Sequence, residues 1–174
     1  HTLPAAFRAR HADILHETGR GSGYWIWKYP AMQEALDSIE PGGFVVYLDA
    51  GCQLNTKGSR RFWQYLDMLR KSKYDVLNFS GFLKDVYQAY KWTTKAVFDH
   101  LHVAANDTRI RNGLMLIGGI QVLRKGPHSA LYLRRINEVL EADAWLFSDR
   151  YNAAAFKADK RFRDNRHDQS ISNV

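Results

Sequence analysis

The feature that most constrains the fold is a short apolar run with a carboxylate directly after it. Residues 44–48 have the sequence FVVYL, and Asp49 follows them. A continuous apolar run of strand length, with β-branched residues, is typical of a strand buried in a parallel sheet. In open sheets of this kind, ligands bind beyond the carboxyl ends of the strands. The pattern therefore places Asp49 at a sheet edge that a ligand can reach.

Helical and strand patterns alternate along the rest of the chain. Helical spacing of apolar residues predicts helices at residues 31–39, 59–71, 127–142 and over most of 84–104. Apolar runs predict further strands at residues 74–79 and 114–123. The second run contains Gly118 and Gly119, and such a pair suggests a bulge or the close approach of a ligand to the backbone. The alternation indicates an α/β fold with a mainly parallel sheet.

Length and composition indicate one globular domain. The 174 residues fit a single domain, in which residues 1–23 form a leading segment and residues 152–174 a basic tail. The chain starts with His1 instead of Met, which indicates a fragment or a processed chain. The single cysteine, Cys52, cannot form an internal disulfide, and this favours a reducing compartment such as the cytoplasm.

The charge balance bears on the kind of partner. A net charge of +7 favours an anionic partner, which includes nucleic acid, phospholipid and small phosphorylated ligands. The solvated surface of a mildly basic enzyme is an equally good interpretation. Trp25 and Trp27 lie among strongly apolar neighbours, so we expect at least one of them in the core and neither to stack on nucleic acid. Gly-rich phosphate loops, paired-cysteine metal motifs and nucleophile elbows are absent from the sequence.

Two places in the sequence could carry chemistry. Asp49 could hold a divalent cation or a ribose hydroxyl, because Mg²⁺ and Mn²⁺ prefer carboxylate oxygens and often bridge them to phosphates. The alternative is an Asp that caps the turn before Gly51. Residues 166–170, with the sequence RHDQS, combine donor, acceptor and titratable groups. Here the alternative is an exposed polar tail.

Four segments together resemble a known family. They are YWIWK at residues 24–28, VYLDAGC at 46–52, GGIQVLRK at 118–125 and RHDQS at 166–170. The set resembles bacterial and viral nucleotide-sugar glycosyltransferase-like proteins of the GT-A fold, with their GYWxWKP, YLDAG and HRHDQS pattern, over roughly residues 20–174. The resemblance implies a GT-A-like, Rossmann-like α/β domain. Its mixed, mainly parallel sheet would be flanked by helices, and the chain would begin after the first strand of that fold.

The resemblance also implies roles for individual residues. Asp168 and Gln169 are the implied catalytic pair beside the reacting sugar, and Gly118 and Gly119 line the acceptor side. Asp49 stands where the family holds Mn²⁺ or Mg²⁺ on the donor diphosphate. The residues implied in donor binding are Trp25, Lys28, Tyr47, Asp49, Gly51 and Arg166. The residues implied in metal binding are Asp49 and His167.

The sequence departs from the family pattern at three positions. Gly51 occupies the position of the second Asp of the metal motif, so a metal would need another ligand there. Tyr29 separates Lys28 from Pro30, and Asn165 replaces the first His of the HRHDQS segment.

The implied function is transfer of a hexose from a nucleotide-diphosphate sugar to a glycan or lipid-linked acceptor. This chemistry belongs to polysaccharide biosynthesis, in the cytoplasm at the inner face of the membrane, with a peripheral membrane contact. The alternative is a GT-A-like module that binds a nucleotide sugar or glycan without turnover. A nucleic-acid-binding domain is the third hypothesis, and we expect no nucleic-acid partner.

One geometric expectation tests the implied site. The reacting sugar is bonded to the donor diphosphate, so a group that stabilises charge on the sugar must reach the same place as the group that holds the diphosphate. We therefore predict that Asp168 and Gln169 lie close to Asp49 in the folded chain.

Overall fold

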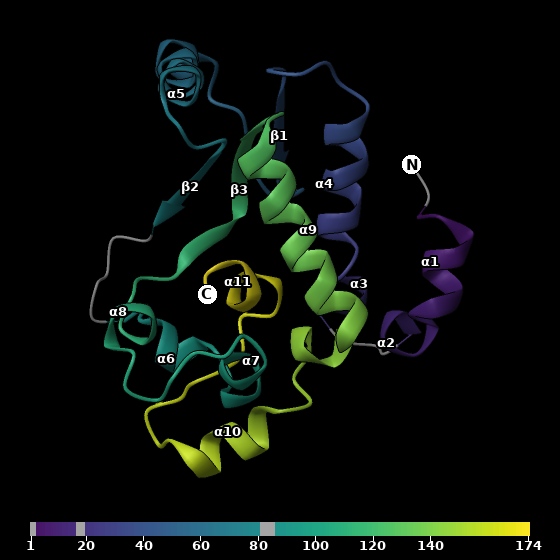
Figure 1. The fold of residues 1–174 in the computed structure, drawn as a ribbon, viewed down its shortest axis with the longest axis vertical. Helices are drawn as coiled ribbons and strands as arrows, with labels where there is room; N and C mark the ends of the chain where they lie inside the picture. Colours follow the sequence, from purple (N-terminus) through teal and green to yellow (C-terminus); the bar gives the residue numbers. More distant parts are fainter. Residues whose placement is uncertain (1–2, 17–19, 81–85) are drawn as a thin grey trace.

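The computed structural model describes residues 3–16, 20–80 and 86–174. Three strands form one small sheet, and helices cover both of its faces (Figure 1). The strands are β1 (Phe44–Leu48), β2 (Val76–Ser80) and β3 (Leu116–Arg124). The helices before β2 are α1 (Ala5–Arg10), α2 (Ala12–His16), α3 (Gly21–Tyr24), α4 (Lys28–Asp37) and α5 (Ser59–Lys71). Those after it are α6 (Ala89–Trp92), α7 (Lys95–His100), α8 (Thr108–Arg111), α9 (Pro127–Ala142), α10 (Asn152–Ala158) and α11 (Asp168–Ser172). Two 3-10 turns are η1 (Thr56–Gly58) and η2 (Ala144–Phe147).

The sheet is antiparallel. Its strand order is β1-β3-β2, and β3 pairs antiparallel with both neighbours. The expected GT-A-like, Rossmann-like fold with a mainly parallel sheet flanked by helices is therefore wrong for the described residues. They form a mixed α/β structure around one small, fully antiparallel sheet.

The position of β1 explains the error. β1 is an edge strand of the described sheet, and Val46 is 39% exposed. Its apolar run matches a strand buried on both faces, but an apolar run alone does not fix strand direction or position in the sheet. The bounds of β1 match the expected residues 44–48.

The expected helices are largely confirmed. α5 and α9 have the predicted bounds. α4 begins before the expected residues 31–39, at Lys28, because Pro30 fits the first turn of a helix, where its missing N–H costs nothing. The stretch 84–104 is helical only at α6 and α7, and residues 84 and 85 lie outside the described part of the chain.

Adjacent residues of β3 point to opposite faces of the sheet and join two apolar clusters. Leu123 belongs to the main core, in which α4 and α9 pack on one face through Leu36 and Leu133. Val122 belongs to a smaller cluster under α5, with Leu66 and Leu69. The period of two along β3 therefore gives the sheet a covered surface on both sides.

The aromatic segment at residues 24–28 is not packed as expected. Neither Trp25 nor Trp27 is fully buried, so the prediction that one of them is core is wrong. The buried side chains here are Tyr24, Ile26 and Tyr29. Tyr24 and Trp25 have φ values of 53° and 60°. The chain turns in a left-handed conformation at this point, which residue pattern alone does not reveal.

The C-terminal residues enter the interior. Asn165 and Ser170 are 0% exposed, and Ile171 is 4% exposed. α11 lies at the centre of the molecule, beside the lower part of β3 (Figure 1). Asn173 Oδ1 accepts from the backbone N–H of Leu116 at 2.8 Å and ties the end of α11 to that strand. These residues are therefore not a loose tail.

No helix of the described residues has both the length and the apolar character needed to cross a membrane.

The packing of α9 gives a direct test of this fold. Leu133 is 0% exposed in the main core, whereas Leu131 on the same helix is 42% exposed. We expect Leu133→Ala to lower the free energy of unfolding by about 2–5 kcal/mol, because it removes buried methyl groups and leaves a cavity. Leu131→Ala is the matched control and should cost less than about 0.5 kcal/mol. Urea unfolding measures both, and equal losses would contradict the assigned helix face.

Candidate functional site

A buried lysine joins three distant parts of the chain. Lys28 is the first residue of α4, and its side chain is 3% exposed. Its Nζ lies 2.5 Å from Asp168 Oδ2 at the start of α11 and 3.2 Å from the carbonyl oxygen of Gly118 in β3. Asp49 Oδ1, just after β1, lies 3.9 Å away. We call these residues, with Tyr47, Gly119 and Gln169, the Lys28 cluster.

Asp49 is the exposed member of the Lys28 cluster. Its backbone N–H donates to the carbonyl oxygen of Gly119 at 2.9 Å, which extends the β1–β3 pairing by one residue. The hydroxyl of Tyr47 donates to Asp49 Oδ1 at 2.7 Å, from two residues earlier on the same side of the strand. The Asp49 side chain remains 45% exposed. The cluster is therefore open to solvent on the Asp49 side.

The two glycines of β3 allow side chains of the protein itself to approach the backbone. A Cβ on Gly119 would lie 2.6 Å from Asp49 Oδ2, and a Cβ on Gly118 would lie 3.4 Å from the Cβ of Gln169. The pairing of β2 with β3 is irregular between the Asn78–Gln121 and Ser80–Leu116 pairs. Of the two alternatives expected at this glycine pair, the bulge is present, and the atoms that approach the backbone are those of Asp49 and Gln169.

Gln169 is fixed on the same side of β3. Its Nε2 donates to the carbonyl oxygen of Leu116. Together with the Lys28 contacts, this places Asp168 and Gln169 beside Gly118 and near Asp49. The predicted proximity of these residues is confirmed.

Burial and charge act in opposite directions on Asp168. Burial raises the pKa of this carboxyl above its ordinary value, and the ammonium group of Lys28 opposes the rise. The nearby Asp49 carboxylate adds to the rise. Burial, the hydrogen bond to Asp49 and its charge also raise the pKa of the Tyr47 hydroxyl far above its usual range, so this hydroxyl stays a donor. With both carboxyl groups ionised, the cluster of one ammonium and two carboxylates carries one net negative charge.

His167 belongs to a neighbouring arrangement. Its Nε2 lies 3.0 Å from Asp149 Oδ1, and its ring stacks on Tyr24 with centroids 5.1 Å apart. The ring of Trp25 is tilted against the His167 ring, with centroids 5.5 Å apart. Burial lowers the pKa of His167 from its ordinary value, and the hydrogen bond to Asp149 opposes this. His167 Nε2 is directed to Asp149. His167 is therefore not placed beside Asp49 as a second metal ligand.

The other residues implied by the resemblance lie outside the Lys28 cluster. Arg166 lies over the ring of Trp92 at 4.3 Å. Gly51 is exposed, with open space where a Cβ would be. Within the described ranges, no group of three or more His, Cys, Asp and Glu side chains is arranged to hold a metal ion. Of the two residues implied in metal binding, Asp49 lies in the Lys28 cluster and His167 is paired with Asp149.

A buried polar row lies behind the Lys28 cluster and was missed by the sequence analysis. Gln121 is 1% exposed, and its Nε2 lies 3.1 Å from the hydroxyl oxygen of Tyr29. The hydroxyl of Tyr132 donates to Gln121 Oε1 at 3.4 Å. In the sheet register Gln121 stands between Tyr47 and Asn78. The one polar residue in the apolar segment IQVL was the signal that could have identified this row.

Asp149, the partner of His167, was missed as well. It follows η2, in the SDR segment before α10, and no spacing or periodicity links it to His167.

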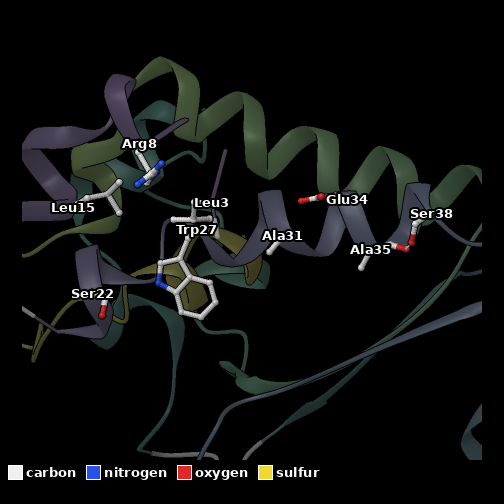
Figure 2. A pocket seen from close by; sticks show the side chains of 9 residues that line it. All are labelled: Leu3, Arg8, Leu15, Ser22, Trp27, Ala31, Glu34, Ala35 and Ser38. Carbon is white, nitrogen blue, oxygen red and sulfur yellow. Dashed lines mark hydrogen bonds between the residues drawn. The ribbon is translucent and has the colours of Figure 1, made fainter. Parts of the chain in front are cut away.

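A separate hollow lies between α1, α2 and α4. Its volume is about 850 Å³, and its lining includes Leu15, Trp27, Ala31 and Ala35 (Figure 2). Trp27 Nε1 donates to the carbonyl oxygen of Gly21 at 3.0 Å. No residue of the Lys28 cluster lines this hollow, although Trp27 directly precedes Lys28.

Comparison of the chain with family models, curated proteins and solved structures finds no match in any of the three.

The glycine at the cluster gives a test of the close packing. We expect Gly119→Ala to lower the free energy of unfolding by about 1–3 kcal/mol, because the new methyl group overlaps the Asp49 carboxylate. Gly51→Ala, where a Cβ meets nothing within 4 Å, is the control and should change stability by less than about 0.5 kcal/mol. Thermal or urea unfolding measures the difference. Equal stability of the two variants would show that Asp49 moves aside freely.

The buried histidine gives a test in pH. The pKa of His167 is lowered in the folded state, so the unfolded chain takes up the proton first as the pH falls. The stability contributed by neutral His167 is therefore complete above about pH 6.5, the unfolded value, and is lost as the pH falls toward the lowered folded value. We expect His167→Gln to weaken the fall in melting temperature between about pH 7.5 and 5.5. His16→Gln, at an exposed position, should show the same fall in melting temperature with pH as the unsubstituted protein. An unchanged pH dependence in His167→Gln would contradict the assignment.

Proposed function

We propose that this protein transfers a hexose from a nucleotide-diphosphate sugar to a glycan or lipid-linked acceptor. The observation that supports this most is the Lys28 cluster, where Asp49 and Asp168 converge from distant parts of the chain beside a glycine pair. The resemblance of four segments, including YLDAG and RHDQS, to nucleotide-sugar glycosyltransferases supports the same chemistry.

The two ends of the donor place opposite demands on the site. Negative charge develops on the departing diphosphate, and positive charge develops on the sugar ring. In our proposal, Asp168 lies beside the sugar, and Lys28 holds its carboxylate in place through the 2.5 Å contact. Gln169 donates through Nε2 to Leu116, so Oε1 remains the acceptor atom for the sugar. An amide cannot act as a general base, so proton removal from the acceptor falls to a carboxylate.

The charge of the cluster favours a metal-assisted donor. A diphosphate alone would first meet the exposed carboxylate of Asp49, and the two would repel each other. Tyr47 and Lys28 both approach Oδ1 of Asp49, so Oδ2 is the atom that would hold Mn²⁺ or Mg²⁺. The remaining ligands would come from the donor phosphates and water, as is common for Mg²⁺. When bound, the metal supplies positive charge to the departing diphosphate.

The cellular setting follows from the proposed acceptor. Cys52 is a free, exposed thiol, which suits a reducing compartment. We propose that the protein acts in the cytoplasm, in polysaccharide assembly, with a peripheral contact to the inner face of the membrane when the acceptor is lipid-linked.

Binding without turnover is the second candidate function. The direct pairing of Asp168 with Lys28 favours it, because a buried carboxylate held by an ammonium group is not free to take a proton from an acceptor. Such a module would bind a nucleotide sugar at the same residues and release it unchanged.

A donor screen separates these functions. The protein is mixed with nucleotide-diphosphate sugars, in Mn²⁺ or in chelator, and melting temperature and nucleoside diphosphate release are measured. We expect one donor to stabilise the fold in Mn²⁺, by about 2.7 kcal/mol when its concentration is 100 times Kd. Asp49→Asn should abolish the Mn²⁺-dependent shift. Asp168→Asn removes the counter-ion of Lys28 and should lower the melting temperature, so it is assayed well below that temperature. Under these conditions it should keep the shift and lose at least about 100-fold in release, because it removes charge from the reacting centre.

Asp67→Asn, at a 55% exposed side chain in α5, should leave both measurements unchanged. Stabilisation by a donor without release would favour the binding module over the enzyme. No stabilisation by any donor, with or without metal, would overturn the proposed function.

A further inference from the structure

Basic side chains gather on two paired segments, one of which reaches Arg166, two residues before Asp168 of the Lys28 cluster. We define the basic strip as Lys91 of α6 with Arg161, Arg163 and Arg166 of the segment between α10 and α11. This segment runs beside α6 before it enters α11 (Figure 1). The backbone N–H of Arg163 donates to the carbonyl oxygen of Lys91 at 2.7 Å, and that of Arg166 donates to Trp92 at 3.0 Å. The strip is therefore a single surface built from two paired segments.

Aromatic rings support the cations of the strip. The guanidinium of Arg161 lies 4.6 Å from the ring centre of Tyr90, and that of Arg166 lies 4.3 Å from the ring centre of Trp92. Lys91 Nζ lies 5.6 Å from the Tyr90 ring. A guanidinium on a ring keeps its N–H edge free for paired hydrogen bonds to a carboxylate. The rings thus hold the arginines ready for a planar acid group.

One arginine of the strip already shows this recognition. Arg161 donates through Nε and Nη2 to the two oxygens of Asp159, at 3.0 and 2.8 Å. Arg163 and Arg166 have no carboxylate partner within residues 3–16, 20–80 and 86–174. Arg163 and Arg166 can therefore each pair with a carboxylate as Arg161 does, and no carboxylate of the described residues occupies them.

The strip and the Lys28 cluster are rigidly connected. The carbonyl oxygen of Trp92 accepts from the backbone N–H of Arg166 and from the hydroxyl of Ser170, at 3.0 and 2.7 Å. Ser170 Oγ also accepts from the backbone N–H of Arg166 at 2.9 Å. Asp168 lies between these two residues in sequence. A molecule bound along the strip therefore lies at a fixed position relative to Asp168.

We propose that the basic strip binds an acidic glycan through its carboxylates and that this glycan is the acceptor. The binding stands on the strip alone, whereas the role as acceptor rests on the proposed function. Carboxylates spaced along a sugar chain match arginines spaced along an extended segment. The sugar hydroxyl to be modified would then project toward Asp168.

Other anionic partners fit the strip less well. The bases of single-stranded nucleic acid bind by stacking on aromatic faces, but cations cover Tyr90 and Trp92 here. Trp92 also stacks on Tyr87, with ring centroids 5.8 Å apart. Proteins that lie on a membrane insert aromatic and aliphatic side chains into it, whereas these rings lie beneath the charges.

Calorimetry with a defined acid glycan tests the proposal. The probe is a short oligogalacturonide, and its methyl ester, which has the same sugar chain without charge, is the control ligand. We expect binding of the acid at low salt and loss of binding as salt approaches about 1 M, where screening shortens to about 3 Å. The double variant Arg163→Gln/Arg166→Gln should weaken binding at least about tenfold, because two charge-assisted contacts are lost. Arg134→Gln/Arg135→Gln, which removes equal charge from exposed positions of α9, should keep the original affinity.

Each outcome decides the proposal. Equal binding of acid and methyl ester, no binding of the acid, or equal loss in both double variants would overturn it. Tighter binding of oligo-dT, or of phosphatidylserine vesicles, would assign the strip to nucleic acid or membrane instead. The donor screen reports separately on the proposed function. Acid-glycan binding without donor stabilisation would support the binding role of the strip and contradict the transferase function. Donor stabilisation without acid-glycan binding would contradict only the binding role of the strip.

Discussion

The fold depends on the neutralisation of one buried charge. An ammonium group with a 3% exposed side chain is tolerated only when it is paired and hydrogen-bonded, and Lys28 meets this need with Asp168 and the Gly118 carbonyl. Loss of one partner from such a buried pair typically costs about 3–5 kcal/mol. The start of α4, the irregular pairing of β3 and the entry of α11 into the interior therefore form one arrangement around Lys28.

The polar row behind this arrangement supports it from the other side. Gln121 engages Tyr29 and Tyr132, and Tyr29 follows Lys28 directly in α4. Burial raises the pKa of both tyrosines, and the charge of Asp168 adds to the rise, so both hydroxyls remain neutral. The Lys28 cluster is thus open on the Asp49 side and closed by neutral polar groups on the core side.

The sequence predicted local elements better than their arrangement. Helical periodicity is regular in α5 and α9, and their bounds were correct. The predicted parallel direction of β1 was wrong. An apolar run does not distinguish an edge strand from a central one, and the direction of pairing depends on residues far along the chain. The proximity of Asp49 to Asp168 was predictable from the chemistry that the resemblance implies. The burial of Lys28 and the pairing of His167 with Asp149 were not predictable, because no local sequence pattern identifies a side chain that is buried or paired through residues far along the chain.

The separation of Lys28 and Asp168 along the chain has a consequence for folding. They lie 140 residues apart, so their contact closes a very long loop, and loop closure costs entropy before the contact repays it. Contacts of such high sequence separation slow folding. During synthesis the N-terminal helices emerge long before α11. Until α11 has been made and has packed against β3, Lys28 lacks the counter-ion that it has in the fold. The core around α4 is therefore completed late, because Lys28, among the most deeply buried charges of the described residues, is neutralised only once α11 has joined the fold.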